Sequence, residues 1–307
     1  MKMGITANHI GLGIDAGGTQ TRWALATASG EIFGSGQVNG ITALQMGSEA
    51  GRVHIQQTIA AIARELPQAR RPEAVCAGIT GYTENGDSIR AIIAAALALD
   101  PASVALRSDI EIVCLDLFAL GEGYVVYAGT GTIAAFIDDA GVLHRAGGRG
   151  AILDDAGGGF WIAIEALRHI WRNEDTHPGS WRDSPMAVEM FKRIGGSQWG
   201  LTREFVYFRE RGQIGELALA VGAAAATDSV AHGILQQAGG ELARLGNALI
   251  SRFGPRPIAL SGRVAQLHPV IEQSLRAALP PDIDLKARNN EAHLAAARIA
   301  AKSTQPD

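Results

Sequence analysis

Near its N-terminus the chain reads Gly13-Ile14-Asp15-Ala16-Gly17-Gly18-Thr19-Gln20-Thr21-Arg22-Trp23-Ala24-Leu25-Ala26, and the fold can be inferred from this stretch. An apolar approach runs into Asp-x-Gly-Gly-Thr, and an alternating run leads away from it, a pattern that predicts strand, tight turn and strand. The backbone N–H groups of Gly17, Gly18 and Thr19 are expected to bind phosphate oxygens. Asp15 is placed to hold a metal ion that bridges phosphates.

A second stretch, from Val125 to Phe136, repeats this plan of strand, Gly/Thr turn and strand. Its turn contains Gly129, Thr130, Gly131 and Thr132, which we also expect to bind phosphate. One such hairpin alone is a weak signal, because an ordinary β-turn has the same composition. Two of them, one early in each half of the chain, predict a duplicated unit.

The segments around these hairpins alternate between strand-like and helix-like patterns, which predicts layered α/β structure. Helices are expected from about Ser48 to Leu66 and from Ser88 to Leu99. Apolar runs from Ala74 to Gly81 and from Ile110 to Leu115 predict buried strands. Ala-rich segments from Ile214 to Arg252 predict a pair of long helices, and their apolar faces would suit a homodimer.

The composition is that of an ordinary soluble globular protein, with 47% hydrophobic and 19% charged residues. A net charge of -4 gives no reason to expect nucleic acid or an acidic membrane as partner. The run from Ala91 to Leu99 is far short of the ~20 apolar residues that cross a bilayer. Residues Met1 to His9 lack the pattern of a secretory signal, so a cytoplasmic location is expected.

The two hairpins resemble the phosphate-1 and phosphate-2 loops of the actin, hexokinase and heat-shock-chaperone ATPase superfamily. The segment Pro257 to Ala265 is similar to the strand end that packs on adenosine there, with Ser261 and Gly262 at the contact and Arg263 where a second glycine is usual. The resemblance implies an α/β fold of two ribonuclease H-like (actin-like ATPase) domains, related by internal duplication, with a cleft between them. It also implies ATP and Mg²⁺ as cofactors.

The segment Gly148 to Gly159 and the helix from Phe160 narrow the resemblance to the N-acetylglucosamine and glucosamine kinases of the BadF/BadG/BcrA/BcrD ATPase family. The domains would then span residues 1–116 and 117–307, with the final helix, 291–301, packing back on the first domain. The implied activity is transfer of phosphate from ATP to the 6-hydroxyl of N-acetylglucosamine or glucosamine, and the implied partner is a small amino sugar.

Asp116 is our expected catalytic base. It directly follows the expected strand from Ile110 to Leu115, and ligands gather at the carboxyl ends of strands in open α/β sheets. It also matches the Asp that precedes the second phosphate loop in the kinases that this chain resembles. An alternative role is to cap a helix from Leu117 to Leu120.

Four further residues are expected to contact the sugar because they match sugar-contacting positions of the family. Asp155 lies in the Asp-x-Gly-Gly segment, and carboxylate oxygens accept hydrogen bonds from neighbouring hydroxyls. Asn39 follows the first hairpin, and Thr80 and Gly81 lie in a Gly-flanked loop. An ordinary turn role is equally open for Asn39, Thr80 and Gly81.

A competing interpretation is an ATP-hydrolysing conformational switch of the dehydratase-activator type, which has no sugar substrate. Proteins of that branch hold an iron–sulfur cluster with cysteines. This chain has two cysteines, Cys76 and Cys114, both within apolar runs where we expect reduced, buried thiols. The sequence therefore favours the kinase.

Overall fold

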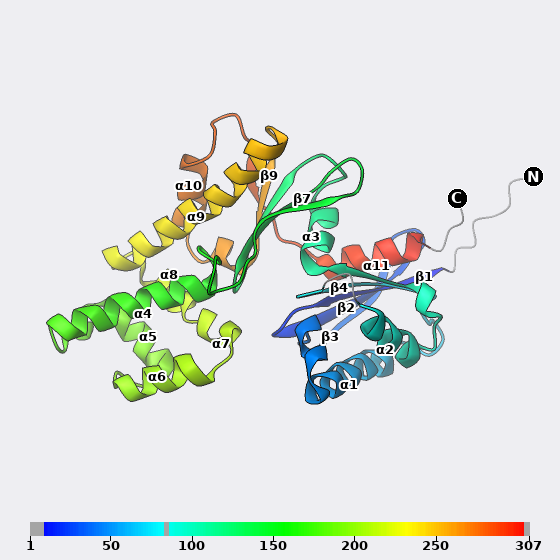
Figure 1. Ribbon diagram of the computed structural model, residues 1–307, viewed down its shortest axis with the longest axis horizontal. Coiled ribbons are helices and arrows are strands. Elements are labelled where there is room, and N and C mark those ends of the chain that lie inside the picture. The colour runs from blue at the N-terminus through cyan, green and yellow to red at the C-terminus, as the bar shows by residue number, and fades with distance from the viewer. Residues whose placement is uncertain (1–8, 83–85, 304–307) are drawn as a thin grey trace, which may run out of the picture. The chain divides into compact units, whose positions relative to one another are not determined.

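The computed structural model of the chain describes residues 9–82 and 86–303, and it divides into two compact units (Figure 1). The first unit runs to Asp116 and takes up the chain again from Asn290, and the second comprises Leu117 to Asn289. Each unit has one five-stranded sheet with helices packed against it. Residues Met1 to Asn8, most of the segment for which we predicted no secretory signal, lie outside the described residues.

The first unit has the strand order β3-β2-β1-β4-β5. Its first three strands pair antiparallel, and β4 and β5 continue the sheet parallel to β1. Its strands are β1 (Ile10–Ala16), β2 (Gln20–Thr27), β3 (Ile32–Asn39), β4 (Ala74–Ile79) and β5 (Val104–Ser108). Its helices are η1 (Ala43–Gly47), α1 (Glu49–Glu65), α2 (Asp87–Leu97), η2 (Pro101–Ser103), α3 (Asp109–Leu117) and α11 (Ala292–Lys302).

The second unit repeats this topology, with the order β8-β7-β6-β9-β10, an antiparallel meander and two further strands parallel to β6. The repeat confirms the predicted fold class and internal duplication. Its strands are β6 (Tyr124–Ala128), β7 (Thr132–Ile137), β8 (Leu143–Gly147), β9 (Ile258–Ser261) and β10 (Leu285–Ala287). Its helices are α4 (Gly159–Thr176), η3 (Ser180–Asp183), α5 (Pro185–Ile194), α6 (Trp199–Phe208), α7 (Arg211–Gly215), α8 (Ala218–Ala224), α9 (Ser229–Phe253), η4 (Arg263–Gln266) and α10 (Pro269–Ala277).

Alternation along β1 explains the layers of the first unit. Leu12 and Ile14 face the core that α1 and α2 cover, whereas Gly11 and Gly13 face α11. A Cβ on Gly13 would lie 2.1 Å from the backbone N of Ala297, so only glycine lets the helix approach this closely. Small residues on both elements, such as Ala24 on β2 and Ala301 on α11, complete this contact.

The strand expected from Ile110 to Leu115 is wrong, because these residues lie in helix α3. Both faces of a short apolar run can be buried in either structure, so its hydrophobicity does not distinguish helix from strand. The strand is the preceding segment, β5, which pairs parallel with β4. In the second unit, the helix expected from Ile214 to Ala226 is instead broken into α7 and α8.

Asp228 joins the beginnings of two helices in the second unit. Its Oδ1 accepts hydrogen bonds from the N–H groups of Val230 (3.0 Å) and Ala231 (3.1 Å) in α9. Its Oδ2 accepts from the Ser184 hydroxyl (2.8 Å) and the Met186 N–H (3.1 Å) at α5. Burial alone would raise the pKa of Asp228, but these hydrogen bonds outweigh it and hold the pKa below its usual value.

We expect Asp228→Ala to lower the free energy of unfolding by about 3 kcal/mol, because it removes a helix cap and two further hydrogen bonds to a charged group. Urea denaturation at neutral pH measures the difference. Since the folded-state pKa is depressed, the stabilisation is present above the usual pKa of 3.8 and is lost as the pH falls through the folded value. A variant as stable as the wild type at neutral pH would contradict this role.

Both cysteines are buried, Cys76 in β4 and Cys114 in α3. Within residues 9–82 and 86–303, no single helix is long and apolar enough to span a membrane. The segments 211–224 and 229–253 reach that size only as a pair, with a bend of 117°.

Candidate functional site

The carboxyl ends of three parallel strands meet at one edge of the first sheet. Asp15 is the penultimate residue of β1, Thr80 follows β4, and Asp109 follows β5. Because these strands are neighbours and run in the same direction, the topology brings all three side chains to the same edge. This edge therefore gathers two carboxylates and a hydroxyl in the first unit.

Asp109 is the carboxylate at this edge that is held by two hydrogen bonds. Its Oδ2 accepts a hydrogen bond of 2.6 Å from the Thr80 hydroxyl, and its Oδ1 accepts from the N–H of Ile110 at 2.8 Å. The Thr80 backbone is fixed as well, because its N–H donates to Ala16 (2.9 Å) and its carbonyl accepts from Ala43 (3.0 Å). Asp109 is therefore held in one orientation by neighbours that are themselves held.

Asp15 forms an ion pair of 2.7 Å with Arg22 on β2. Burial raises its pKa above the usual value, Arg22 opposes this rise, and the negative charge of Asp109 adds to it. Asp15 is on β1 and Asp109 directly follows β5, and these two strands lie on either side of β4 in the sheet. Within the part of the chain that the structure describes, Oδ1 of Asp15 accepts no hydrogen bond, so one oxygen is available to a cation.

The turn between β1 and β2 presents backbone groups outward. Gly18 and Thr19 are exposed, and Gly17 closes the turn by donating its N–H to the carbonyl of Gln20 (3.0 Å). Asn39 is the exposed last residue of β3, beside this turn. The next residue, Gly40, approaches so closely that a Cβ there would lie 2.5 Å from the carbonyl carbon of Gly18.

Asp116 does not lie at a strand end. It is in the last turn of α3, where its Oδ2 accepts a hydrogen bond of 2.9 Å from the backbone N–H of Glu291. The helix expected from Leu117 to Leu120 is also absent, since α3 ends at Leu117. The observed role of Asp116 is to fix the start of α11.

In the second unit, the loop from Gly129 to Gly131 lies against the beginning of α4. The carbonyl groups of Gly129 and Thr130 accept hydrogen bonds from the N–H groups of Gly159 (2.8 Å) and Phe160 (3.0 Å). Thr132 is buried, and its hydroxyl donates to the carbonyl of Ala156 (3.0 Å), so this hydroxyl maintains the loop.

A small pocket opens beside this loop, and Gly129, Thr130 and Arg263 are among the residues that line it. Ser261 is buried at the end of β9, and Gly262 follows with a φ of +98°. A Cβ on Gly262 would lie 2.3 Å from the carbonyl oxygen of Ala128, so both conformation and space require glycine. The segment predicted to contact adenosine thus borders the same pocket as the phosphate-type loop.

Asp155 is only 7% exposed and forms an ion pair with Arg211 on α7. It also lies directly beneath the loop, since a Cβ on Gly131 would be 2.5 Å from its Oδ2. Thr80 is followed by Gly81, whose φ of +75° favours glycine at this bend. The structure thus places Asp155 in the second unit, and Asn39, Thr80 and Gly81 in the first.

In residues 9–82 and 86–303, no group of three or more His, Cys, Asp or Glu side chains could hold a metal ion by itself. Mg²⁺ commonly needs only one or two carboxylates when phosphates supply further oxygens. Asp15, with its available oxygen and its neighbour Asp109, fits that donor chemistry.

Asp109 was missed from the sequence because a strand was assigned to residues 110–115. These residues lie in helix α3, and the strand is the preceding segment, β5. A usable signal was present: Asp109 and Glu111 both lie in the first turn of α3. Acidic residues are favoured in the first turn of a helix, so they could have indicated that the helix begins at Asp109.

A family model and two curated proteins are similar to this chain in sequence. The model of the BadF/BadG/BcrA/BcrD ATPase family matches residues 12–283. An N-acetyl-D-glucosamine kinase from Dictyostelium discoideum is 24% identical over 181 residues, which cover 55% of this chain and 56% of that protein. An N-acetylmuramic acid/N-acetylglucosamine kinase from Clostridium acetobutylicum is 28% identical over 178 residues, which cover 53% and 54%. The chain spans about half the length of these curated relatives.

Solved structures share the fold over nearly the whole chain. A candidate N-acetylglucosamine kinase from Chromobacterium violaceum has a TM-score of 0.74 at 24% identity, over 96% of this chain and 99% of that one. A ROK family glucokinase from Streptomyces griseus, in complex with glucose and AMPPNP, has a TM-score of 0.63 at 17% identity, with the same coverage. These similarities show a common two-domain architecture.

Proposed function

Because the chain belongs to the BadF/BadG/BcrA/BcrD ATPase family, we propose that it is an ATP-dependent amino-sugar kinase that phosphorylates the 6-hydroxyl of N-acetylglucosamine or glucosamine. The names of the two curated relatives support the sugar class. The matches cover about half of each relative. Whether the sugar carries an acetamide or a free amine at its 2-position is therefore a question for experiment.

The observation that carries the proposal is Asp109 with its Thr80 hydrogen bond, next to Asp15. A sugar hydroxyl is a poor nucleophile at neutral pH, and a positioned carboxylate that takes its proton typically raises the rate by ~10²–10⁴-fold. We therefore assign the base to Asp109 and not to Asp116, whose carboxylate is engaged with the backbone of Glu291. ATP hydrolysis by a conformational switch has no need of a base for a sugar hydroxyl.

The remaining residues would bind and orient the reactants. In the first unit, Thr80 orients the base, and the N–H groups of Gly18 and Thr19 would bind phosphate oxygens, while the N–H of Gly17 closes the turn. Asn39 and Gly81 border the acceptor sugar. Asp15 would hold Mg²⁺, which supplies charge neutralisation to the phosphates when bound.

In the second unit, the loop containing Gly129, Thr130, Gly131 and Thr132 would bind phosphates, and Ser261 and Gly262 would border adenosine. Asp155 would accept hydrogen bonds from sugar hydroxyls, with Arg211 fixing its orientation.

Substitution of Arg263 tests the proposal that Ser261 and Gly262 border adenosine. Arg263 is exposed and lines the pocket beside Gly129 and Thr130. We expect Arg263→Gly to change the free energy of ATP binding by about 1 kcal/mol, the loss of a stacking contact with the base. Calorimetric titration with an ATP analogue measures this change. Complete loss of binding would show that Arg263 itself holds the nucleotide, against our assignment.

A coupled assay of ADP release, with and without amino sugars, tests the function. A kinase releases ADP fast only when N-acetylglucosamine or glucosamine is present. ADP release at the same rate without sugar would instead support the ATP-driven switch. Glucose serves as the control, because it differs from glucosamine only in the 2-amino group.

A further inference from the structure

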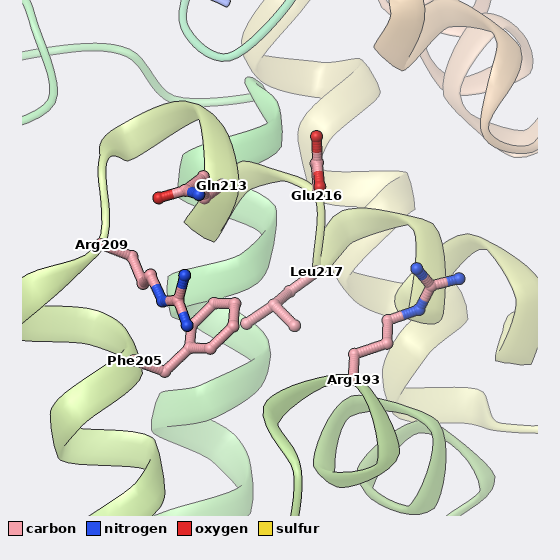
Figure 2. Close-up of a pocket in the computed structure, with 6 residues that line it drawn as sticks. All are labelled: Arg193, Phe205, Arg209, Gln213, Glu216 and Leu217. Carbon is pink, nitrogen blue, oxygen red and sulfur yellow. The ribbon is translucent and has the colours of Figure 1, made fainter.

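A cavity of about 290 Å³ lies in the helical part of the second unit, apart from the residues assigned above. Three consecutive helices and the segments after two of them form its walls: Arg193 is in α5, Phe205 is in α6 and Arg209 directly follows it, Gln213 is in α7, and Glu216 and Leu217 lie between α7 and α8. Figure 2 shows Phe205 and Leu217 with Arg209 and Arg193 on either side. The cavity is near the lower limit of ordinary small-molecule sites.

The two arginines are available to a ligand. Within the described ranges, neither Arg193 nor Arg209 takes part in an ion pair, and Arg209 lies with its guanidinium carbon 5.9 Å from the centre of the Phe205 ring. Guanidinium groups bind phosphate oxygens through paired hydrogen bonds, and two of them match the charge of a phosphate monoester.

The other lining residues suit a ring, hydroxyl groups and an amine in addition to the phosphate. Phe205 is only partly buried, so its ring offers an apolar surface of the kind that a sugar ring stacks on, and the buried Leu217 lies among the lining residues. The side-chain oxygen of Gln213 accepts from the N–H of Glu210 (3.1 Å), which leaves its amide N–H groups to donate to hydroxyl groups. Glu216 carries a negative charge that would repel a simple anion and would attract an amine.

We propose that this cavity binds a phosphorylated amino sugar with a free amine, and that its occupancy changes nucleotide affinity. The second part rests on the proposed function, because it identifies the neighbouring pocket as the nucleotide site. Glu216 lines both cavities, and Leu217 and Ala218 continue from one to the other. A ligand that fixes Glu216 thus acts on a wall of the nucleotide pocket, and the coupling is reciprocal.

Calorimetric titration of the full chain with glucosamine 6-phosphate tests the site, with saturating N-acetylglucosamine present to fill the acceptor site. Glucose 6-phosphate and inorganic phosphate are the matched probes, since they lack the amine and the sugar. We expect at least tenfold tighter binding of glucosamine 6-phosphate than of either probe. No saturable binding, or equal affinity for all three, overturns the proposal.

Variants locate the binding. Replacing both arginines, Arg193→Gln with Arg209→Gln, should weaken binding of glucosamine 6-phosphate at least tenfold, and Glu216→Gln should remove the preference over glucose 6-phosphate. Arg203→Gln, which removes an exposed charge from the same helix α6, should change affinity less than twofold. Equal effects of the Arg203 change and the double change would overturn the assignment.

The effector role has its own readout, the affinity for ADP. We expect glucosamine 6-phosphate to change ADP affinity at least threefold in the wild type and not in the double variant. Unchanged ADP affinity in the wild type overturns the effector role. These binding measurements do not depend on turnover. Failure of the proposed kinase function would appear in the coupled assay, whereas failure of the effector site would appear in the binding of glucosamine 6-phosphate and ADP.

Discussion

Asp109→Asn is expected to lower kcat for the amino sugar by about 100-fold or more, with ATP and sugar still bound within about tenfold of the wild type. Asparagine has nearly the same shape and can still accept the Thr80 hydrogen bond, but it cannot take a proton. Steady-state kinetics with the coupled assay give kcat, and thermal melting should show little change in Tm.

Asp116→Asn is the matched control, since it makes the same change seven residues along the same helix. Its amide oxygen can still accept from the N–H of Glu291, so kcat should stay within about threefold of the wild type. Near-normal turnover of Asp109→Asn together with an inactive Asp116→Asn would reverse the assignment and restore the base to Asp116.

Asp155→Asn is the second variant for which we expect a large effect, namely a rise of at least about tenfold in KM for the sugar together with a lower kcat. A buried carboxylate accepts stronger hydrogen bonds than an amide, and the difference is felt both in sugar binding and in the transition state. Kinetics at saturating ATP separate KM from kcat.

Arg211→Gln distinguishes this role from a purely structural one, because Arg211 is the ion-pair partner of Asp155. If Asp155 serves only to hold α7, both variants should lose Tm alike and leave the sugar KM unchanged. That result would contradict a role of Asp155 in sugar binding.

Much of the fold was predictable because local pattern and tertiary packing agree. The apolar approach through Leu12 and Ile14 to the Gly/Thr turn indicated a strand and a hairpin, and the same kind of turn recurs where the second sheet begins. The β1–β2 hairpin of the first sheet and the β6–β7 hairpin of the second therefore follow from the turn residues between their strands.

The sheet edge that carries Asp15, Thr80 and Asp109 was predictable only in part, because it depends on which apolar run forms the strand. The run from Ile110 to Leu115 is more hydrophobic than β5, yet β5 pairs with β4 and leaves Asp109 at the edge. Parallel pairing is a long-range contact that local hydrophobicity does not encode.

The second cavity could not be predicted from the sequence. Arg193, Phe205 and Glu216 are separated along the chain, and each is an ordinary residue in its own helix. Only the packing of α5, α6 and the broken α7–α8 segment brings them together, and the sequence pattern predicted one continuous helix at that break.

Phosphorus NMR of the reaction mixture tests most directly whether the chain transfers phosphate to an amino sugar. With ATP, Mg²⁺ and N-acetylglucosamine or glucosamine, we expect a new phosphomonoester signal coupled to the two protons on carbon 6. It should grow at the rate at which ATP is consumed, and more slowly by about 100-fold or more for Asp109→Asn. Inorganic phosphate as the sole product, at the same rate with and without sugar, would contradict the kinase.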